Sequence, residues 1–400
     1  MVVEHKTTTA DISEASDYWE RLILDAQVSN YVALTRAAGH TPMGVLYDVI
    51  RKFKLPPYKA TPVESREYTQ AKSKGCPECK KKNPAPLPHV DEKTGLECED
   101  MWSTGDGPQD WTASPTPEQL SENPPSRRIL TEPSRLYAGQ RTEDETLDEY
   151  RQRLREELSA HAESYYRRAT IRRLKGEEEN ASRNVWMIAR SIRESVRLNQ
   201  FPQNTAACKN YGSWCEFWPV CSGKASLDDP TLYRDSGEHE ELPQVTAETQ
   251  TAASEAKRLP IISTSSAQAF LTCPTMYRNR YVLRRRSIGS SLALVVGTII
   301  HAGLEVWWTT PERDKALDLA IAAMAKSAAE YGNAIDAFEM VRMEELMRGY
   351  DARWCNEPLR VIGAEIELTA PLINPETGHA SKTWQRGGKL DALIHAPEES

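Results

Sequence analysis

Hydrophobic and polar positions alternate in some parts of the chain and follow helical spacing in others. Strand-type runs cover residues 2–6, 44–50, 361–372 and 384–396, and a turn with proline and glycine separates the last two. Helical spacing of apolar residues predicts helices over residues 18–39, 142–161, 297–308 and 312–353, and a further helix face over 185–196. This mixture predicts an α/β fold with helices flanking a central sheet.

Two segments lack such patterns. Residues 60–135 are rich in proline and polar residues, which indicates a long surface insertion. Residues 222–258 carry acidic and small residues, which is typical of a flexible joint. We therefore divide the chain into residues 1–221 with the insertion, the joint 222–258, and residues 259–400.

Composition narrows the class of protein. A chain of 400 residues with 39% hydrophobic and 27% charged residues can bury a large core. It shows neither a run of eighteen apolar residues nor a secretory signal, so we expect a cytoplasmic protein without a membrane partner. Because the net charge is -8, binding of nucleic acid would need local basic patches.

Two arginine-rich segments are candidates for such patches. Either could also be an ordinary solvated face, and Tyr277 and Tyr281 could stack on bases or pack in the core. The candidate DNA-binding residues near Cys273 are Arg278, Arg280, Arg284, Arg285 and Arg286, and the second segment holds Arg167, Arg168, Arg172 and Arg173.

Glu4 and Lys6 lie two positions apart on a predicted strand, so their side chains point to one face. A carboxylate there can bind Mg²⁺ or Mn²⁺, while the lysine can hold water or stabilise charge on a phosphate. Asp391, on the last predicted strand, would supply a second carboxylate, and we expect Leu390, Ala392 and Ile394 to face the core. Taken alone, each of these residues is more often a surface or strand-end charge.

A wider set of motifs resembles the RecB-like branch of the PD-(D/E)XK nucleases, in particular the phage and CRISPR-associated exonucleases that carry an iron–sulfur cluster. The family series has a serine-rich start with Cys-Pro, Gly-x-x-x-His, a strand glutamate, Gly-x-x-Asp, Glu-x-Lys, Gln-x-x-x-Tyr and three clustered cysteines. In this chain the matching positions are Cys273, Gly297 to His301, Glu365, Gly388 to Asp391, Glu4 to Lys6, Gln27 to Tyr31, and Cys208, Cys215 and Cys221.

The resemblance implies a restriction-endonuclease-like mixed central sheet with flanking helices and a helical region that carries the cysteines. His301, Asp391 and Glu4 would bind Mg²⁺ or Mn²⁺, Lys6 would be catalytic, and Gln27 and Tyr31 would lie at the active site. Glu365 would be an accessory residue, although a structural salt bridge explains it nearly as well. A histidine in an apolar helix, such as His301, is otherwise most often a core residue.

The order of these motifs departs from the family, because the later half of the series precedes the earlier half. The chain therefore looks circularly permuted, with residues 222–258 joining the family's natural ends. Strands 2–6 and 384–396 would still pair, since exposed polar turns tolerate new chain ends. A joint of this length favours a monomer, with a domain-swapped dimer as the competing arrangement.

The resemblance implies hydrolysis of single-stranded DNA or DNA ends by an exonuclease. The processes it suggests are recombination, repair or phage replication in a bacterial or phage-infected cell, with recombination or replication proteins as further partners. Two alternatives stay open: a non-catalytic DNA-binding scaffold that keeps the fold, and a regulator stabilised by zinc.

Cysteine usage bears on these alternatives. Without an export signal, the eight cysteines favour metal or cluster ligands over disulfides. Cys208, Cys215, Cys221 and the distant Cys273 could hold a [4Fe–4S] cluster or zinc, or have no metal, and the resemblance favours the cluster. The separate group with a Cys-x2-Cys spacing is either a zinc loop or part of an insertion without metal, and its members are Cys76, Cys79, His89 and Cys98.

Overall fold

The computed structural model describes residues 1–66, 93–96, 138–210, 212–236, 259–289, 291–357 and 359–395, together with Leu242 and a few positions between 72 and 136. The chain divides into two units. Unit 1 combines Met1–Leu55 with Leu147–Ser400, and unit 2 is Pro56–Thr146. Unit 2, which contains the predicted insertion, has the pairs β3 (Lys72–Ser73) with β6 (Thr131–Glu132) and β4 (Trp102–Ser103) with β5 (Trp111–Thr112), and the 3-10 turn η2 (Val63–Ser65).

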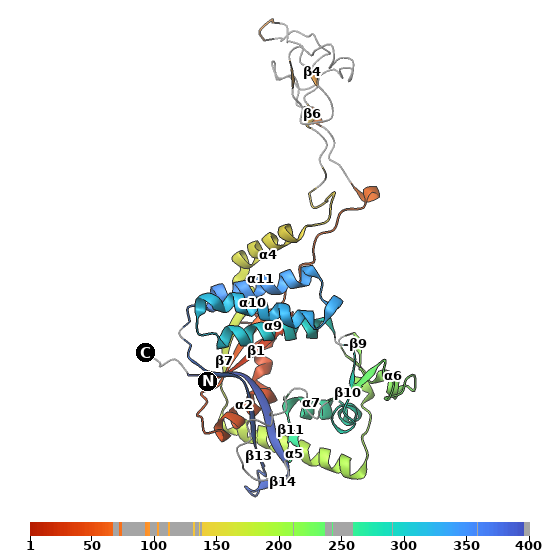
Figure 1. Ribbon diagram of the computed structural model, residues 1–400, viewed down its shortest axis with the longest axis vertical. Helices are drawn as coiled ribbons and strands as arrows, with labels where there is room; N and C mark the ends of the chain where they lie inside the picture. Colours follow the sequence, from red (N-terminus) through yellow and green to blue (C-terminus); the bar gives the residue numbers. More distant parts are fainter. Residues whose placement is uncertain are drawn as a thin grey trace. The chain divides into compact units, whose positions relative to one another are not determined.

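A mixed six-stranded sheet forms the centre of unit 1, in agreement with the predicted α/β class (Figure 1). Its order is β11-β14-β1-β2-β7, and β13 pairs with the other edge of β14. Parallel pairs join β1 to β2 and β11 to β14, and the remaining pairs are antiparallel. The strands are β1 (Val2–Thr8), β2 (Val45–Arg51), β7 (Tyr166–Ile171), β11 (Ile261–Ile262), β13 (Val361–Ile373) and β14 (Ala380–Ile394).

The first and last described strands of the chain lie side by side, as the sequence predicted (Figure 1). Val2 pairs with Leu393 and Val3 with Ala392, and the amino group of Met1 donates to Ile394 O at 2.6 Å. β11 pairs with the same edge of β14 further back, at Gln385 and Arg386. The edge of β14 between these two partners contains Asp391.

Helices cover both faces of the sheet. On one face, Val3, Leu46 and Ile50 pack in a core with α4, α9, α10 and α11. On the other face, Val2, Tyr47 and Leu390 pack against α2 and the segment before it. The helices are α1 (Asp17–Glu20), η1 (Arg21–Leu24), α2 (Ala26–Ala37), α4 (Leu147–His161), α5 (Lys175–Leu198), α7 (Thr264–Thr272), α9 (Leu292–Thr309), α10 (Arg313–Ala329) and α11 (Ala337–Trp354).

Shorter elements complete unit 1. They include the hairpin of β8 (Lys209–Asn210) with β9 (Ser213–Trp214), and the pair of β10 (Tyr233–Asp235) with β12 (Arg285–Ser287). The remaining turns and helices are η3 (Ala162–Ser164), η4 (Thr205–Ala207), α6 (Trp218–Cys221), α8 (Pro274–Tyr277), the π-helical turn η6 (Arg278–Val282) and η7 (Gly332–Ala334).

Helix α9 is long and apolar enough to cross a membrane by length and composition. In the fold, however, its apolar residues, including Val295, Ile299 and Trp308, are buried in the core beside the sheet. A core helix satisfies the same criteria of length and apolarity, and this packing accounts for the composition of α9.

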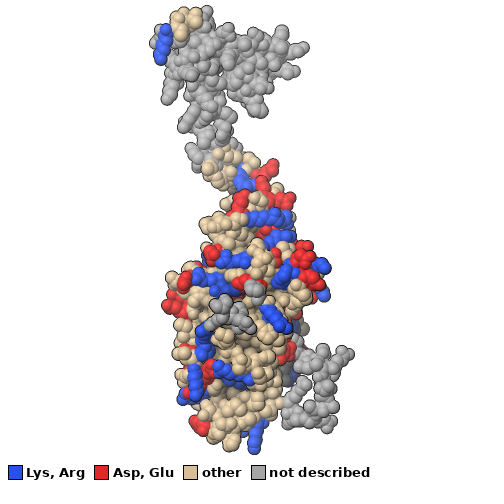
Figure 2. Space-filling model, turned by 90° about the vertical axis from the view of Figure 1, so that its left-hand side faces the viewer, with Lys and Arg blue, Asp and Glu red and all other residues tan. Residues whose placement is uncertain are grey.

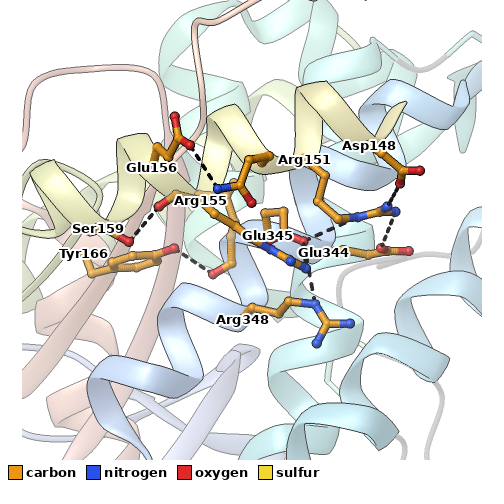
Figure 3. A network of polar contacts seen from close by, with 11 residues as sticks. Asp148, Arg151, Arg155, Glu156, Ser159, Tyr166, Glu344, Glu345 and Arg348 are labelled. Atoms are coloured by element: carbon orange, nitrogen blue, oxygen red, sulfur yellow. Dashed lines mark hydrogen bonds and ion pairs between the residues drawn. The ribbon is translucent and has the colours of Figure 1, made fainter. Parts of the chain in front are cut away.

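Ion pairs fasten α4 to α11 (Figure 3). The buried carboxylate of Glu345 accepts from Arg155 Nε at 2.9 Å and Nη2 at 3.0 Å, and it lies 3.6 Å from Arg151 Nε and 3.7 Å from Arg348 Nε. Three partly exposed guanidinium groups thus compensate one carboxylate that water does not reach. On the face drawn in Figure 2, the two signs of charge are interspersed across the described surface of unit 1.

Several boundaries differ from the sequence-based predictions. The helix expected over residues 18–39 is interrupted, because Asp25 is extended and its carboxylate caps α2 by accepting from Gln27 N at 2.6 Å. The prediction missed β7, whose alternation is obscured by arginines. The helix expected over residues 312–353 is divided into α10 and α11. The segment 222–258, expected to be a flexible joint, contains β10, which pairs with β12.

The side chain of Tyr166 should make Gly349 intolerant of a methyl group. A Cβ at Gly349 would lie 3.0 Å from Tyr166 Cζ and still closer to its hydroxyl, which donates to Leu346 O at 2.8 Å in the core. Alanine gains about 1 kcal/mol in helix propensity, but overpacking costs about 1–3 kcal/mol. We expect Gly349→Ala to lower the free energy of unfolding, measured with urea.

The control is Gly176→Ala in α5, where an added Cβ meets no atom within 4 Å. This control should be neutral or stabilising. Equal stabilisation by both substitutions would contradict the packing described around Tyr166.

Candidate active site

The predicted catalytic residues line one cavity of ≈ 790 Å³ in unit 1. It opens beside the point where β1 meets β14, between α2 and α9. The predicted site residues among its lining are Glu4, Lys6, Gln27, Tyr31, His301, Glu365 and Asp391. Residues that are far apart in the sequence therefore surround one space.

The two carboxylate-bearing strands are held together at the site by a backbone donor. His5 N donates to Asp391 Oδ2 at 2.7 Å. Because side chains alternate along β1, Glu4 and Lys6 share the face opposite to that of His5. Lys6 Nζ forms an ion pair with Glu4 Oε1. This register places one carboxylate from each strand at the same cavity.

Helix α2 adds an amide that connects the predicted catalytic side chains. Gln27 Nε2 donates to Glu4 Oε1 at 2.8 Å and to Tyr31 Oη at 2.5 Å, and Gln27 Oε1 accepts from Lys6 Nζ at 3.1 Å. Gly388 allows α2 to approach β14, because a Cβ there would lie 2.9 Å from Leu34 Cδ1. The amide of Gln27 therefore fixes the position of both Glu4 and Lys6.

Burial and like charge disfavour ionised carboxylates in this cavity. Burial, followed by the neighbouring charge of Asp391, raises the pKa of Glu4 to about 7, although Lys6 opposes the shift. Burial also raises the pKa of Asp391, against the opposing effects of His5 and Lys6. The pKa of Lys6 is itself raised, because Glu4 and Asp391 outweigh the effect of burial. The site has an excess of negative charge that a cation would relieve.

His301 reaches the cavity from the middle of α9. Burial, followed by the charge of His5, lowers the pKa of His301 to about 4, so its imidazole is neutral near pH 7. A neutral imidazole is the form that binds metal ions. The ring centroid of His301 lies 6.2 Å from that of His5.

A buried polar network behind His5 escaped the sequence analysis. His5 Nδ1 lies 3.2 Å from Asp48 Oδ2, which also accepts from Arg168 Nη2 at 3.0 Å and from the hydroxyl of Tyr350. Trp308 Nε1 donates to the same hydroxyl at 2.9 Å. The one sequence feature that could have indicated this network is Asp48, a carboxylate within the largely apolar strand β2. Arg168, a candidate for a surface patch, is instead buried in this network.

Glu365 lies at the level of Asp391, between the ladder pairs Ala364–Ala392 and Ile366–Leu390. Its φ of 53° is left-handed, which is strained for a residue with a side chain, and its carboxylate forms an ion pair with Lys389.

The strand alternation predicted around Asp391 was wrong. Ala392 and Ile394 pack in the core that contains α9, but Leu390 packs on the side of α2. The irregular backbone at Glu365 accompanies this change of side.

Glu4, Asp391 and His301 offer donor atoms that suit a divalent ion. Glu4 Oε2 is buried and has no hydrogen-bond partner, so one carboxylate oxygen is left for a ligand. Carboxylate oxygen with neutral imidazole is a donor set that suits Mn²⁺ and, through its oxygens, Mg²⁺. In the described part of the chain, the side chains of three or more His, Cys, Asp or Glu residues are nowhere grouped tightly enough for one ion.

The four cysteines that the resemblance groups together lie around a second, small cavity. Cys208, Cys215, Cys221 and Cys273 line it with Phe217 and Trp218. Asn204 N donates to Cys273 Sγ at 3.4 Å. Burial, followed by the neighbouring cysteine sulfurs, raises the pKa of Cys221. The other candidate metal residues, Cys76, Cys79, His89 and Cys98, lie outside the described residues.

The arginines predicted to bind DNA have different surroundings. Arg280 forms an ion pair with Glu216, and Arg285 with Asp228 and Asp235. The guanidinium of Arg286 lies 5.1 Å from the ring centroid of Tyr281. The exposed residues of the group include Arg284, while Arg278 is half-buried.

Tyr277 and Tyr281 are buried and stack at 5.2 Å, so the core-packing alternative holds for them.

Comparison with known proteins adds one finding. Residues 261–399 match the family model of the PD-(D/E)XK nuclease superfamily. The matched segment contains Cys273, His301, Glu365 and Asp391, and it leaves out Glu4 and Lys6. Neither curated proteins nor solved structures show a significant match to the chain. The match supports a nuclease-type hydrolase domain over residues 261–399, within a mixed α/β fold.

The ionisation of Glu4 should weaken the metal-free protein. Its folded pKa of about 7 exceeds the ordinary glutamate pKa of 4.5, so the folded state binds more protons between these values. The contribution of Glu4 to the free energy of unfolding is therefore greatest below this range and falls as pH rises through about 7. In the presence of a chelator, we expect Glu4→Gln to be more stable than the wild type, with a difference that grows from about pH 5 to about pH 8.

Urea unfolding of both proteins at each pH measures this difference. His301, whose lowered pKa has the opposite effect on stability, and Asp391 are present in both proteins, so the difference reports Glu4 together with its electrostatic coupling to these two residues. Glu376→Gln, on the exposed hairpin turn, is the matched control. A difference that does not change with pH would contradict the buried, charged environment described for Glu4.

Proposed function

We propose that the protein is a metal-dependent deoxyribonuclease in which strands from both ends of the sequence form one catalytic centre. The observation that supports this most directly is the bond from His5 N to Asp391 Oδ2, 2.7 Å long, beside the pairing of β1 with β14. It brings the glutamate and lysine of Glu-x-Lys to the aspartate within the matched superfamily segment.

The proposed ligands of the divalent ion are Glu4, Asp391 and His301. When bound, the ion polarises the phosphate and lowers the pKa of water. The raised pKa of Lys6, caused by Glu4 and Asp391 against the effect of burial, keeps its ammonium protonated, so it can stabilise negative charge on the phosphate. Gln27 keeps Lys6 and Glu4 in place, and Tyr31 closes the α2 side. Glu365 would act as an accessory group through Lys389.

The order of the motifs supports a circular permutation of the family sequence. We propose that the permuted chain acts as a monomer. The family series continues at Glu4, and β1, which contains Glu4, pairs with β14 of the segment that matches the superfamily. By resemblance, the substrate would be single-stranded DNA or DNA ends, and exonuclease action the mode of cleavage. Recombination, repair or phage replication in the cytoplasm would be the setting.

We further propose that Cys208, Cys215, Cys221 and Cys273 hold a [4Fe–4S] cluster. The support is that they line one cavity together with aromatic residues, and that Cys273 comes from a different part of the sequence. A cluster spreads four thiolates around several iron atoms, so it needs a wider spacing of sulfurs than a single ion does. Phe217 is buried at this cavity, which would limit access of solvent.

Removal of the lysine ammonium should abolish most of the activity. We expect Lys6→Ala to cut end-labelled single-stranded DNA about 10²–10³-fold more slowly than the wild type in Mn²⁺, because a charge that stabilises the transition state is lost. The assay is product formation on gels, with DNA binding measured in parallel.

Lys326→Ala, on the exposed face of α10, is the matched control and should keep wild-type activity. Equal degradation by Lys6→Ala would remove the catalytic assignment. Absence of cleavage by every protein, with binding retained, would favour the scaffold alternative.

Metal analysis tests the cysteine proposal. Protein purified without oxygen should contain about four iron and four acid-labile sulfide per chain. Cys221→Ser should lower both, while Cys355→Ser, which changes a cysteine distant from the cavity, should not. Zinc in place of iron would refute the cluster.

A further inference from the structure

A third cavity of unit 1 has the character of a binding site for nucleic acid. It has a volume of ≈ 320 Å³ and lies at the turn end of the β13–β14 hairpin, where this hairpin meets α5 (Figure 1). None of the predicted catalytic or cysteine residues contributes to it.

Two tryptophans give this cavity its apolar walls. Trp186 from α5 and Trp384 from β14 are half-buried and pack against a core cluster that includes Ala189 and Leu372. Their packing fixes the indole rings, so contact with a ligand would cost little side-chain entropy. A rigid aromatic wall is the part of a site on which a base can stack.

Cationic side chains surround the same cavity. Arg190 and Arg193 lie three residues apart on α5, so they project from neighbouring positions, and Lys382 faces them from β14. No aspartate or glutamate lines this cavity, and within the described parts of the chain these three form no ion pair or hydrogen bond through their side chains. Three cationic side chains at one cavity stand out in a chain with a net charge of -8, and of the three, Arg193 also interacts electrostatically with Glu194, its neighbour on α5.

Strand β14 contains residues of both this cavity and the candidate active site, namely Trp384 and Asp391. Asp391 lies seven positions after Trp384 on β14, which corresponds to about 23 Å along an extended strand. A polynucleotide with one unit in this cavity therefore needs only a few further nucleotides to reach the carboxylates. The ≈ 320 Å³ volume falls at the small end of ligand pockets, which suits one nucleotide unit.

We propose that this cavity binds one nucleotide of single-stranded DNA, with the base against the tryptophans and the phosphates between Arg190, Arg193 and Lys382. The inference rests on the proposed nuclease function, since it assigns a second contact of the same substrate strand. This contact would bind the DNA strand at a distance from the scissile bond. The protein would therefore prefer longer oligonucleotides.

Binding is measured by fluorescence anisotropy of a labelled oligothymidylate in the presence of a chelator, so the result does not depend on cleavage. We expect Trp384→Ala to weaken binding about ten-fold, the magnitude of one stacked base, and Trp384→Phe to retain most of it. We expect Arg190→Gln with Arg193→Gln to flatten the dependence of log affinity on log salt by about 1.4, or about 0.7 for each lost phosphate contact.

Arg190 and Arg193 are exposed, so their substitution should not affect folding and tests the site even if Trp384→Ala misfolds. Urea unfolding of each variant verifies that it is folded. Lys326→Gln is the control, because it removes one charge from α10 without touching this cavity. Unchanged affinity and salt slope in both the tryptophan and the arginine variants would overturn the proposal.

If the wild type binds and the variants do not, while no protein cleaves DNA, the site stands and the proposed nuclease function fails.

Discussion

One strand pairing determines whether this protein has a catalytic centre. β1 joins β14 through only two residue pairs, Val2 with Leu393 and Val3 with Ala392, and beyond them His5 N binds the carboxylate of Asp391. Everything else in the cavity depends on that register, because a shift by one residue would turn Glu4 and Lys6 to the opposite face of the sheet. β2 reinforces the register from the other side, since it pairs with β1 along all seven residues.

Hydrogen-bond donors and a lysine surround the two buried carboxylates of the cavity. Glu4 and Asp391 are buried together, and Lys6, the Gln27 amide and the His5 backbone supply the hydrogen-bonding partners that the cavity offers. Behind the strand, Asp48 and Arg168 hold His5 through a buried network that also includes Tyr350. Arg168 keeps the pKa of Asp48 well below its usual range despite burial, so the network remains ionised while the cavity carboxylates favour protonation. A site with raised carboxylate pKa values and an unpartnered Glu4 oxygen is prepared for a cation.

The sequence predicted which distant residues lie around one cavity better than it predicted the boundaries of the helices and strands. The spacing of Glu4 and Lys6 placed both on one face of a strand, while His301 and Asp391 were added by resemblance to a nuclease family. The pattern could not show the break at Asp25, because a carboxylate that caps a helix looks like any polar residue within an amphipathic stretch. Nor could it reveal β7, whose two adjacent arginines hide its pairing with β2 at the edge of the sheet, or Asp48, whose partners come from distant segments. Such long-range contacts have no local signature.

Calorimetric titration of Mn²⁺ into the wild type, Glu4→Gln, Asp391→Asn and the double variant tests the shared site most directly. If β1 and β14 bind the same ion, each single substitution should remove most of the Mn²⁺ affinity. The loss of binding free energy in the double variant should then be far smaller than the sum of the losses in the two single variants. Strictly additive losses, or Mn²⁺ binding that survives both single substitutions, would contradict the account.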